Sequence, residues 1–231
     1  MIHLAALQVP ACRADPVRGA QVNVVGTTTL LAAAAAAGLG TPFVYASSAA
    51  AFAAADGGDE PSGHPDTHYG VYKLANEESA RVFAAETGLA SIGLRPYVVY
   101  GPGRDQGLTS APTLAMEAAA RGEGYVLPYS GRSQLQYAPD VAAAFVAAAR
   151  ATATGADVVN VPGVTAAAED VVTAIERAVP SVAGRIEVTG SSLPFPPELD
   201  ASRFADVVGQ VAVTPLEDGV AATIAHFRRA A

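Results

Sequence analysis

The chain has a single cysteine, few charged residues and no long uninterrupted apolar run. The one cysteine, Cys12, excludes an internal disulfide and is typical of the reducing cytoplasm, where we expect this protein to reside. The longest apolar stretch, LLAAAAAAGLG at residues 30–40, consists mostly of alanine and is too short to cross a bilayer. The first residues show no basic segment followed by an apolar core, so we expect no signal peptide. These absences exclude disulfide-rich secreted proteins and membrane-spanning proteins as classes.

Metal-ligating and charged residues are also scarce. The four histidines show no ligand spacing such as HxxxH, which predicts that the chain holds no metal: His3, His64, His68 and His226. The net charge is −8 at pH 7, with a pI near 4.9, which speaks against nucleic acid and anionic membranes as partners. Only 16% of the residues are charged, against about a quarter in an average globular protein. This deficit predicts a large buried surface, part of it at a subunit interface.

The sequence does contain an alternation of apolar runs and helical patterns. Strands are predicted at 2–6, 42–47 and 91–101, and helices between them at 16–37 and 69–87. This order is typical of a parallel sheet with right-handed crossovers, so it predicts an α/β fold. At 231 residues the chain is long enough for one such domain, and we expect a single domain over its whole length.

The signals at helix ends agree with these boundaries. Asp15 is a predicted N-cap, and Pro16 fits the first turn because its missing N–H costs little there. Gly38 and Gly88 are predicted helix stops. After Gly107 the pattern becomes less regular. In that half we predict helices at 109–122, 140–151, 165–180 and 215–229, short strands within 125–140, and strands at 157–162 and 185–190.

The segment YGVYK carries the first indication of chemistry. It places Tyr69 and Lys73 four residues apart on a predicted helix, so that the ammonium lies near the phenol. A nearby cation favours the phenolate and moves a phenol from about pH 10 toward neutral pH as a proton carrier. A neighbouring serine hydroxyl would hold a carbonyl or an alcohol in line with that phenol. YxxxK alone is more often an ordinary helix surface.

Two further segments accompany it, FVYASSAAAF at 43–52 and GLRPYVVYGPGR at 93–104. In this order and spacing the three segments resemble the extended short-chain dehydrogenase/reductase family, the NAD-dependent sugar-nucleotide epimerases and dehydratases. The resemblance covers nearly the whole chain. It implies that Ser48, Tyr69 and Lys73 are the catalytic residues. Ser48 is chosen because it stands directly before the alanine-rich run, where the family's serine stands.

The resemblance also implies a fold, a reduced Rossmann-like parallel sheet flanked by helices. Residues 1–104 would carry the core of that sheet, and residues 105–231 a smaller C-terminal substrate lobe and a late sheet strand. The departure from the family pattern lies at the start. MIHLAALQVP resembles the family's fourth strand, and neither GxGxxG nor GxxGxxG occurs in the sequence. The strand at 2–6 is therefore expected to form an unprotected apolar sheet edge.

This departure decides the cofactor prediction. By resemblance, the nicotinamide side of a dinucleotide would face Ala5, Ala6, Asn23, Lys73 and Val98. In dinucleotide-binding folds a Gly-rich turn and the helix N-terminus after it hold the pyrophosphate. Each lost charge-assisted hydrogen bond weakens binding by about 1.5–3 kcal/mol. We therefore expect no tightly bound NAD, with NAD(P) bound only if the missing segment is supplied.

Three functions stay open. The first is a cofactor-independent isomerase, lyase or cyclase, with Tyr69 as general acid/base, Ser48 as hydroxyl partner and Lys73 as electrostatic support. The second is an NAD-dependent epimerase, dehydratase or oxidoreductase whose cofactor segment comes from an upstream part of the protein or from a partner chain. The third is a non-catalytic binding subunit. Retention of all three residues favours the two enzymes.

The substrate is expected to be a small molecule. Gln8, Thr109 and Gln136 are predicted pocket residues, although each also fits an ordinary polar position in a loop or strand. The family often has an arginine for a sugar-nucleotide diphosphate seven residues before the acid numbered Asp140 here. That position is Ser133, which argues against a nucleotide-sugar substrate.

The predicted assembly is a homodimer. The apolar edge at 2–6 and the helices at 16–37 and 69–87 would expose more apolar surface than a soluble monomer normally tolerates. In the resembling family the two corresponding helices pair with their copies in a four-helix interface. We expect a two-fold dimer through these helices or through the exposed sheet edges, and the alternative is a monomer whose own C-terminal half covers the edge.

Overall fold

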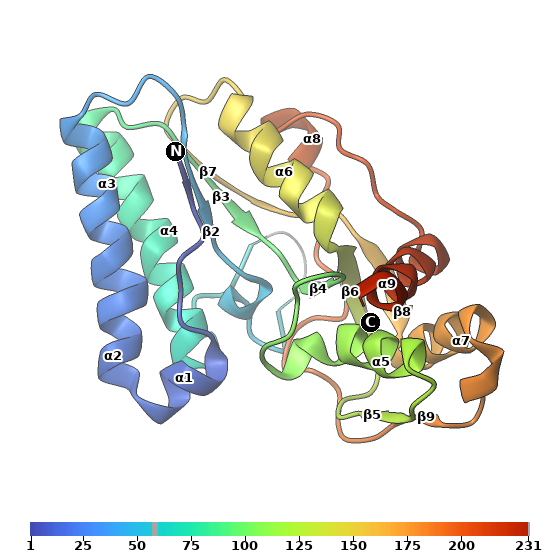
Figure 1. The fold of residues 1–231 in the computed structure, drawn as a ribbon. Coiled ribbons are helices and arrows are strands. Elements are labelled where there is room, and N and C mark those ends of the chain that lie inside the picture. The colour runs from blue at the N-terminus through green and yellow to red at the C-terminus, as the bar shows by residue number, and fades with distance from the viewer. Residues whose placement is uncertain (57–59, 231) are drawn as a thin grey trace. The chain divides into compact units, whose positions relative to one another are not determined.

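The computed structural model describes residues 1–56 and 60–230, and Figure 1 shows its ribbon. The chain forms two compact units that alternate along the sequence. The first unit consists of 1–96, 142–161 and 199–211, and the second of 97–141, 162–198 and 212–231. Each unit is built on its own β-structure.

The first unit contains a four-stranded sheet in the order β1-β2-β3-β7. Its strands are β1 (Ile2–His3), β2 (Phe43–Ala46), β3 (Ser91–Arg95) and β7 (Ala156–Asn160). All neighbouring pairs run parallel, in a register that places Val44 of β2 opposite both Ile2 and Ile92. The parallel α/β sheet predicted from the sequence is therefore confirmed, and so is the late strand that joins it.

Strand β1 is shorter than the predicted 2–6. After His3 the backbone leaves the sheet, and the Leu7 N–H donates to Asn23 Oδ1 at 2.7 Å. Within the described residues β1 pairs with β2 alone, so it is an edge strand. Ile2 on this edge is 40% exposed, and Leu4 just after the strand is 58% exposed, so the start of the chain exposes apolar side chains as predicted.

Helices cover both faces of this sheet. They are α1 (Val9–Ala14), α2 (Pro16–Ala20), α3 (Gly26–Ala36), α4 (His68–Thr87), α6 (Ala138–Arg150, mostly in this unit) and α8 (Phe204–Val207). Figure 1 shows α2, α3 and α4 on one face and α6 and α8 on the other. The core beneath α3 and α4 consists of Leu31, Ala34, Phe43, Tyr45, Ala80 and Leu89.

The predicted helix at 16–37 is present, but it is not uniform. A π-helical turn, Gln21–Val25, joins α2 to α3. Asp15 caps the start as predicted, since its Oδ1 accepts from the Arg18 N–H at 2.9 Å. The short α1 before it was not predicted, because Gln8 at its N-cap is not a typical capping residue.

Helix α4 matches its predicted boundaries closely. The Thr67 hydroxyl oxygen accepts from the Gly70 N–H at 3.0 Å and starts the helix. Gly88 ends it in the left-handed conformation, with φ of +73°. Tyr72 ties α4 to α2, because its hydroxyl donates to the Pro16 carbonyl at 2.7 Å. Helix α4 is thus fixed at its ends and along its side.

Pro96 divides one predicted strand into two that belong to different sheets. The sequence predicts a strand at 91–101, broken at Pro96. In the structure, β3 ends at Arg95 in the first unit, and β4 (Val98–Tyr100) lies in the second. Proline cannot donate to a ladder, so the chain leaves the first sheet at Pro96 and enters the second at Val98.

The second unit contains two small sheets and three longer helices. Strands β4, β6 (Arg132–Tyr137) and β8 (Val164–Ala167) form one sheet in that order, and β5 (Tyr125–Leu127) pairs with β9 (Ile186–Val188). The helices are α5 (Ala111–Ala120), α7 (Ala168–Ala178) and α9 (Leu216–Ala230).

The sequence prediction is wrong at 165–167. The pattern predicts a helix that begins at 165, but these residues form the end of β8 and pair antiparallel with β6. Helix α7 begins at Ala168, and the Asp170 carboxylate in its first turn accepts from the Ala167 N–H at 2.8 Å. An alanine run carries no periodicity that separates strand from helix, so the pairing with β6 decides the boundary.

Candidate functional site

Ser48 lies where β2 ends and a short 3-10 turn, Ala49–Ala51, begins. Its hydroxyl oxygen accepts from the Ala50 N–H at 3.1 Å and so caps the turn. The turn is held to the chain after β3, because the Ala49 N–H donates to the Pro96 carbonyl at 2.9 Å. Among the described residues no acceptor takes the Ser48 hydroxyl proton, which leaves the O–H available to donate to a bound molecule.

Tyr69 and Lys73 stand on the first turns of α4, one helical turn apart. The Lys73 Nζ lies 5.3 Å from the centre of the Tyr69 ring. The same Nζ donates to the Ala46 carbonyl at the end of β2, at 2.5 Å. Lys73 is only 3% exposed, whereas Tyr69 and Ser48 are half-buried. The predicted proximity of the lysine and the tyrosine is therefore present in the fold.

Gly70 lets α4 approach the Ser48 turn, and sequence reasoning did not single it out. A Cβ atom at this position would lie 2.0 Å from the Ala50 carbonyl oxygen and 3.0 Å from its carbon. Because both are backbone atoms, a side chain at position 70 would push the helix away from the turn. The available signal was a glycine inside a helix, which costs about 1 kcal/mol against alanine and so needs a packing reason.

A buried ion pair lies one turn further along α4. The Arg95 guanidinium donates to both carboxylate oxygens of Glu77, Nε to Oε1 at 2.8 Å and Nη2 to Oε2 at 2.7 Å. The Ser47 hydroxyl donates to the same Glu77 Oε1. Both charged side chains are less than 5% exposed, and the Arg95 guanidinium carbon lies 5.2 Å from the centre of the Phe52 ring. Ser47 is thus engaged by Glu77, while Ser48 is held only by the turn that it caps.

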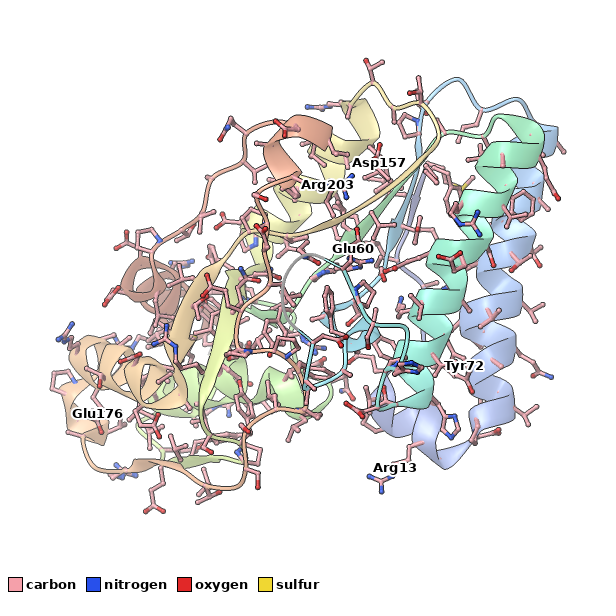
Figure 2. All side chains as sticks on the ribbon, turned by 180° about the vertical axis from the view of Figure 1, so that it is seen from behind. Arg13, Glu60, Tyr72, Asp157, Glu176 and Arg203 are labelled. Atoms are coloured by element: carbon pink, nitrogen blue, oxygen red, sulfur yellow. The ribbon has the colours of Figure 1, made fainter. Side chains whose placement is uncertain are left out.

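This pair extends to the surface through Glu60. Its carboxylate lies 3.5 Å from both Arg95 and Arg203, and Arg203 also contacts Asp157 at 3.4 Å. Figure 2 shows Arg203 and Asp157 close together, with Glu60 beside them. The chain gave no signal for these contacts, because their members come from four separate segments of the sequence.

Asn23 sits in the π-helical turn and fixes the segment after β1. Its side chain accepts from the Leu7 N–H at 2.7 Å and donates to the Leu7 carbonyl at 2.8 Å. Its own carbonyl accepts from Asn76 Nδ2 at 3.0 Å and from the Thr27 hydroxyl at 2.7 Å. Cys12 lies against the same amide, with its Sγ 3.3 Å from Nδ2. Asn23 therefore joins the segment after β1 to α4.

Burial determines the charge of Lys73. It lowers the pKa of the ammonium to about 8, and the nearby Cys12 and Glu77 oppose this by raising the pKa. Burial also raises the pKa of the Cys12 thiol and lowers that of His3, whose ring lies 3.0 Å from the Thr27 hydroxyl. Lys73 is thus a cation that loses its proton just above neutral pH.

The remaining predicted residues belong to both units. In the first, Ala5 and Ala6 follow β1, and Gln8 lies at the N-cap of α1. In the second, the Thr109 hydroxyl accepts from Arg104 at 2.9 Å. Three further residues of the second unit that the sequence singled out are buried, namely Val98 on β4 and Ser133 and Gln136 on β6. The Gln136 side chain accepts from the Tyr97 N–H at 2.8 Å. Asp140 is half-buried, and its carboxylate accepts from the Thr214 N–H and hydroxyl.

The residues present do not fit a whole dinucleotide. Lys73 and Asn23, which the resemblance assigns to the nicotinamide side, are buried in the first unit and bonded to the Ala46 and Leu7 carbonyls. The pyrophosphate needs a Gly-rich turn at a helix N-terminus, and the 231 residues contain no such motif.

The described part of the chain offers neither a metal site nor a membrane span. No three His, Cys, Asp or Glu side chains there are grouped so that they could hold a metal ion. No helix in residues 1–56 or 60–230 combines the length and the apolar character needed to cross a membrane.

Comparison with known proteins identifies the family. The family described as the NAD dependent epimerase/dehydratase family matches residues 1–161. The chain belongs to this family. A curated relative, the GDP-6-deoxy-D-mannose reductase of Pseudomonas aeruginosa, is 36% identical over 110 residues. That alignment spans 45% of this chain and 36% of the relative, so it covers about a third of the relative's length.

Solved structures agree with the family and the fold. A partial-consensus L-threonine 3-dehydrogenase is similar to 98% of this chain and to 79% of its own, with 22% identity and a TM-score of 0.89. MoeE5, solved in complex with UDP-glucuronic acid and NAD, covers all of this chain over 79% of its own, with 28% identity and a TM-score of 0.83. These likenesses confirm the Rossmann-like α/β fold that the sequence predicted.

Proposed function

We propose that this chain is an epimerase/dehydratase-type enzyme in which Tyr69 exchanges a proton with an oxygen atom of a small-molecule substrate. The observation that carries this is the position of the buried Lys73 ammonium, 5.3 Å from the Tyr69 ring and bonded to the strand end that leads to Ser48. A positive charge at this distance favours the ionised form of a phenol. A lysine on a helix surface with no function would be exposed, and Lys73 is 3% exposed.

The proposed chemistry needs only these three side chains and water. The Ser48 O–H donates a hydrogen bond to a substrate carbonyl oxygen, and the Tyr69 O–H transfers its proton to that oxygen. The proton on the neighbouring carbon leaves to water, so that an enol forms and Tyr69 becomes a phenolate beside the Lys73 ammonium. When the enol collapses, carbon takes a proton from water and Tyr69 recovers its own. Isomerisation and elimination both begin with this step, and aldol cleavage forms the same kind of enol by breaking a carbon–carbon bond instead of losing that proton.

A second function is favoured by the family and by MoeE5, which was solved with NAD bound. A bound nicotinamide would supply a hydride acceptor, and by resemblance Ala5, Ala6, Asn23, Lys73 and Val98 would lie on its side. In that case Tyr69 takes the hydroxyl proton of a substrate alcohol while Ser48 orients it. This alternative requires the phosphate-binding segment that the 231 residues do not contain.

The proposed substrate class is a nucleotide sugar or its keto derivative. The names of the relatives support it, since one is a GDP-6-deoxy-D-mannose reductase and MoeE5 was solved with UDP-glucuronic acid and with UDP-glucose. Ser133, in place of the expected arginine, counts against a tightly held diphosphate. Gln8 and Thr109 are proposed to contact the substrate. Gln136 is proposed as a pocket residue that does not contact the substrate through Oε1, because this oxygen already accepts from the Tyr97 N–H.

The test is proton exchange without a dinucleotide. A keto derivative of a nucleotide sugar is incubated with the protein in D2O, and ¹H NMR follows loss of the proton beside the carbonyl. We expect Tyr69→Phe to slow exchange by about 10²–10⁴-fold, while the matched Tyr72→Phe keeps the rate, because the Tyr72 hydroxyl serves α2. Equal rates for wild type and Tyr69→Phe would refute the role. Turnover that appears only with added NAD would favour the second function.

A further inference from the structure

Glu77 continues the row that begins with Tyr69 and Lys73. The three residues are spaced four apart on α4, so their side chains leave the helix on one face. That face meets the end of β2 residue by residue. Lys73 Nζ binds the Ala46 carbonyl, and the Glu77 carboxylate accepts from the next residue's hydroxyl, that of Ser47. Ser48 is the residue after these two contacts.

We propose that Glu77 is a positioning residue of this site, which anchors the backbone before Ser48 and supplies the counter-charge of the Lys73 ammonium. The inference rests on the proposed function for the roles of Ser48 and Lys73. Glu77 touches no reacting atom and acts through its neighbours. Arg95 holds the Glu77 carboxylate in place with two bonds, and a buried carboxylate held in this way cannot turn away from the site.

Among the groups around Lys73, Glu77 is the one that supplies a negative charge. The titratable groups that face the ammonium are His3 from β1, Cys12 from α1, and Tyr69 and Glu77 from α4. Burial favours the neutral forms of both His3 and Cys12, since it lowers the pKa of the first and raises that of the second. Glu77 is therefore the carboxylate, within the described residues, that raises the pKa of Lys73.

The chain offers a direct measurement, because Lys73 is its only lysine. Protein labelled with ¹³C-lysine gives one side-chain Hε–Cε signal, and its shift between pH 6 and 10.5 reports the lysine pKa without any assay of activity. We expect Glu77→Gln to move this titration downward by about half a pH unit or more. The matched control Glu78→Gln, which removes an exposed carboxylate paired with Arg81, should leave it in place.

The anchoring role has its own readout. The Ala50 N–H donates to the Ser48 oxygen, so its hydrogen exchange reports whether the turn is held. Ser47→Ala breaks the bond to Glu77 without changing any charge. We expect it to speed exchange at Ala50 about tenfold and to leave the lysine titration unchanged. Unchanged exchange at Ala50 would refute the anchoring.

A second variant covers the case in which Glu77→Gln does not fold, because it leaves Arg95 with weaker pairing in a buried position. Replacing both partners, Glu77→Leu with Arg95→Met, removes the pair and is often tolerated in a core. The lysine titration should again move downward. An unchanged titration in the variants that fold would overturn the electrostatic role. Since neither readout uses turnover, loss of the proposed function in the D2O assay would leave this result standing, and the two failures are distinguishable.

Discussion

Replacing Lys73 with methionine should change how stability depends on pH. The folded-state pKa of this lysine is about 8, against 10.5 for an unperturbed lysine. Between these two values the unfolded chain binds more protons than the folded one, so stability rises with pH. Below pH 8 both states are protonated, and burial of the charge lowers the stability by its full amount. Above 10.5 both are neutral and the effect ends.

The magnitude follows from the same two values. Their difference corresponds to about 3 kcal/mol in total, and most of this is recovered between pH 7 and pH 10. Methionine has a similar length and no charge, so Lys73→Met should abolish this gain. The quantity to compare is the free energy of unfolding of wild type minus that of Lys73→Met. It should rise by about 2–3 kcal/mol over this interval.

Urea denaturation followed by circular dichroism at half-unit steps of pH measures this difference. The pKa of Cys12 depends in part on Lys73, so both proteins also carry Cys12→Ala, which removes that thiol from the comparison. Arg81→Met is the matched control, because it removes an exposed cation from the same helix and should leave the wild-type slope unchanged. Parallel curves for wild type and Lys73→Met would refute the assignment of a buried, weakly basic lysine to this position.

Three further predictions follow from other features of the chain. Gly70→Ala should destabilise the protein by about 2 kcal/mol or more in urea denaturation, because its Cβ would meet the Ala50 carbonyl. In the control Gly26→Ala the nearest atom is 3.8 Å from the new Cβ, so this variant should be more stable by about 0.5–1 kcal/mol, and equal effects would contradict the packing role of Gly70. We propose a homodimer through the helix faces that expose Val17 (70%) and Val25 (57%). Light scattering should give twice the 23.2 kDa mass of one chain for wild type and the mass of one chain for Val25→Asp, and a single-chain mass for wild type would refute the dimer. Calorimetric titration with NAD should give a Kd weaker than about 1 mM, and micromolar binding would mean that phosphate contacts exist without a Gly-rich turn.

Local patterns predicted much of the first unit because the information lies within a few residues. The four-residue spacing of Tyr69 and Lys73 is enough to bring the ammonium near the ring, and the 5.3 Å distance bears this out. Asp15 starts its helix through a hydrogen bond, and Gly88 ends its helix through a left-handed dihedral angle, and both features involve only close neighbours. Such features are read from sequence because the chain itself enforces the distance.

What the sequence did not reveal depends on partners that are distant along the chain. Arg95 meets Glu77 from a strand 18 residues later, and nothing in either segment names the other. The π-helical turn exists around Asn23, whose bonds reach Leu7 and Asn76 on other elements. Gly70 was visible within YGVYK, but the obstacle that it avoids is the backbone of Ala50. Tertiary contacts decide such positions, and a single sequence does not list them.

The alternation of the two units along the chain constrains how the protein emerges during synthesis. The chain passes between the units after residues 96, 141, 161, 198 and 211. Strand β7, which completes the parallel sheet, is not available until Asn160 has left the ribosome. By then residues 97–141 of the second unit have already been synthesised. Neither unit can be expressed as one uninterrupted fragment. Folding of the first unit is therefore a late event that needs most of the polypeptide, and the apolar strand β3 has no neighbour β7 until then.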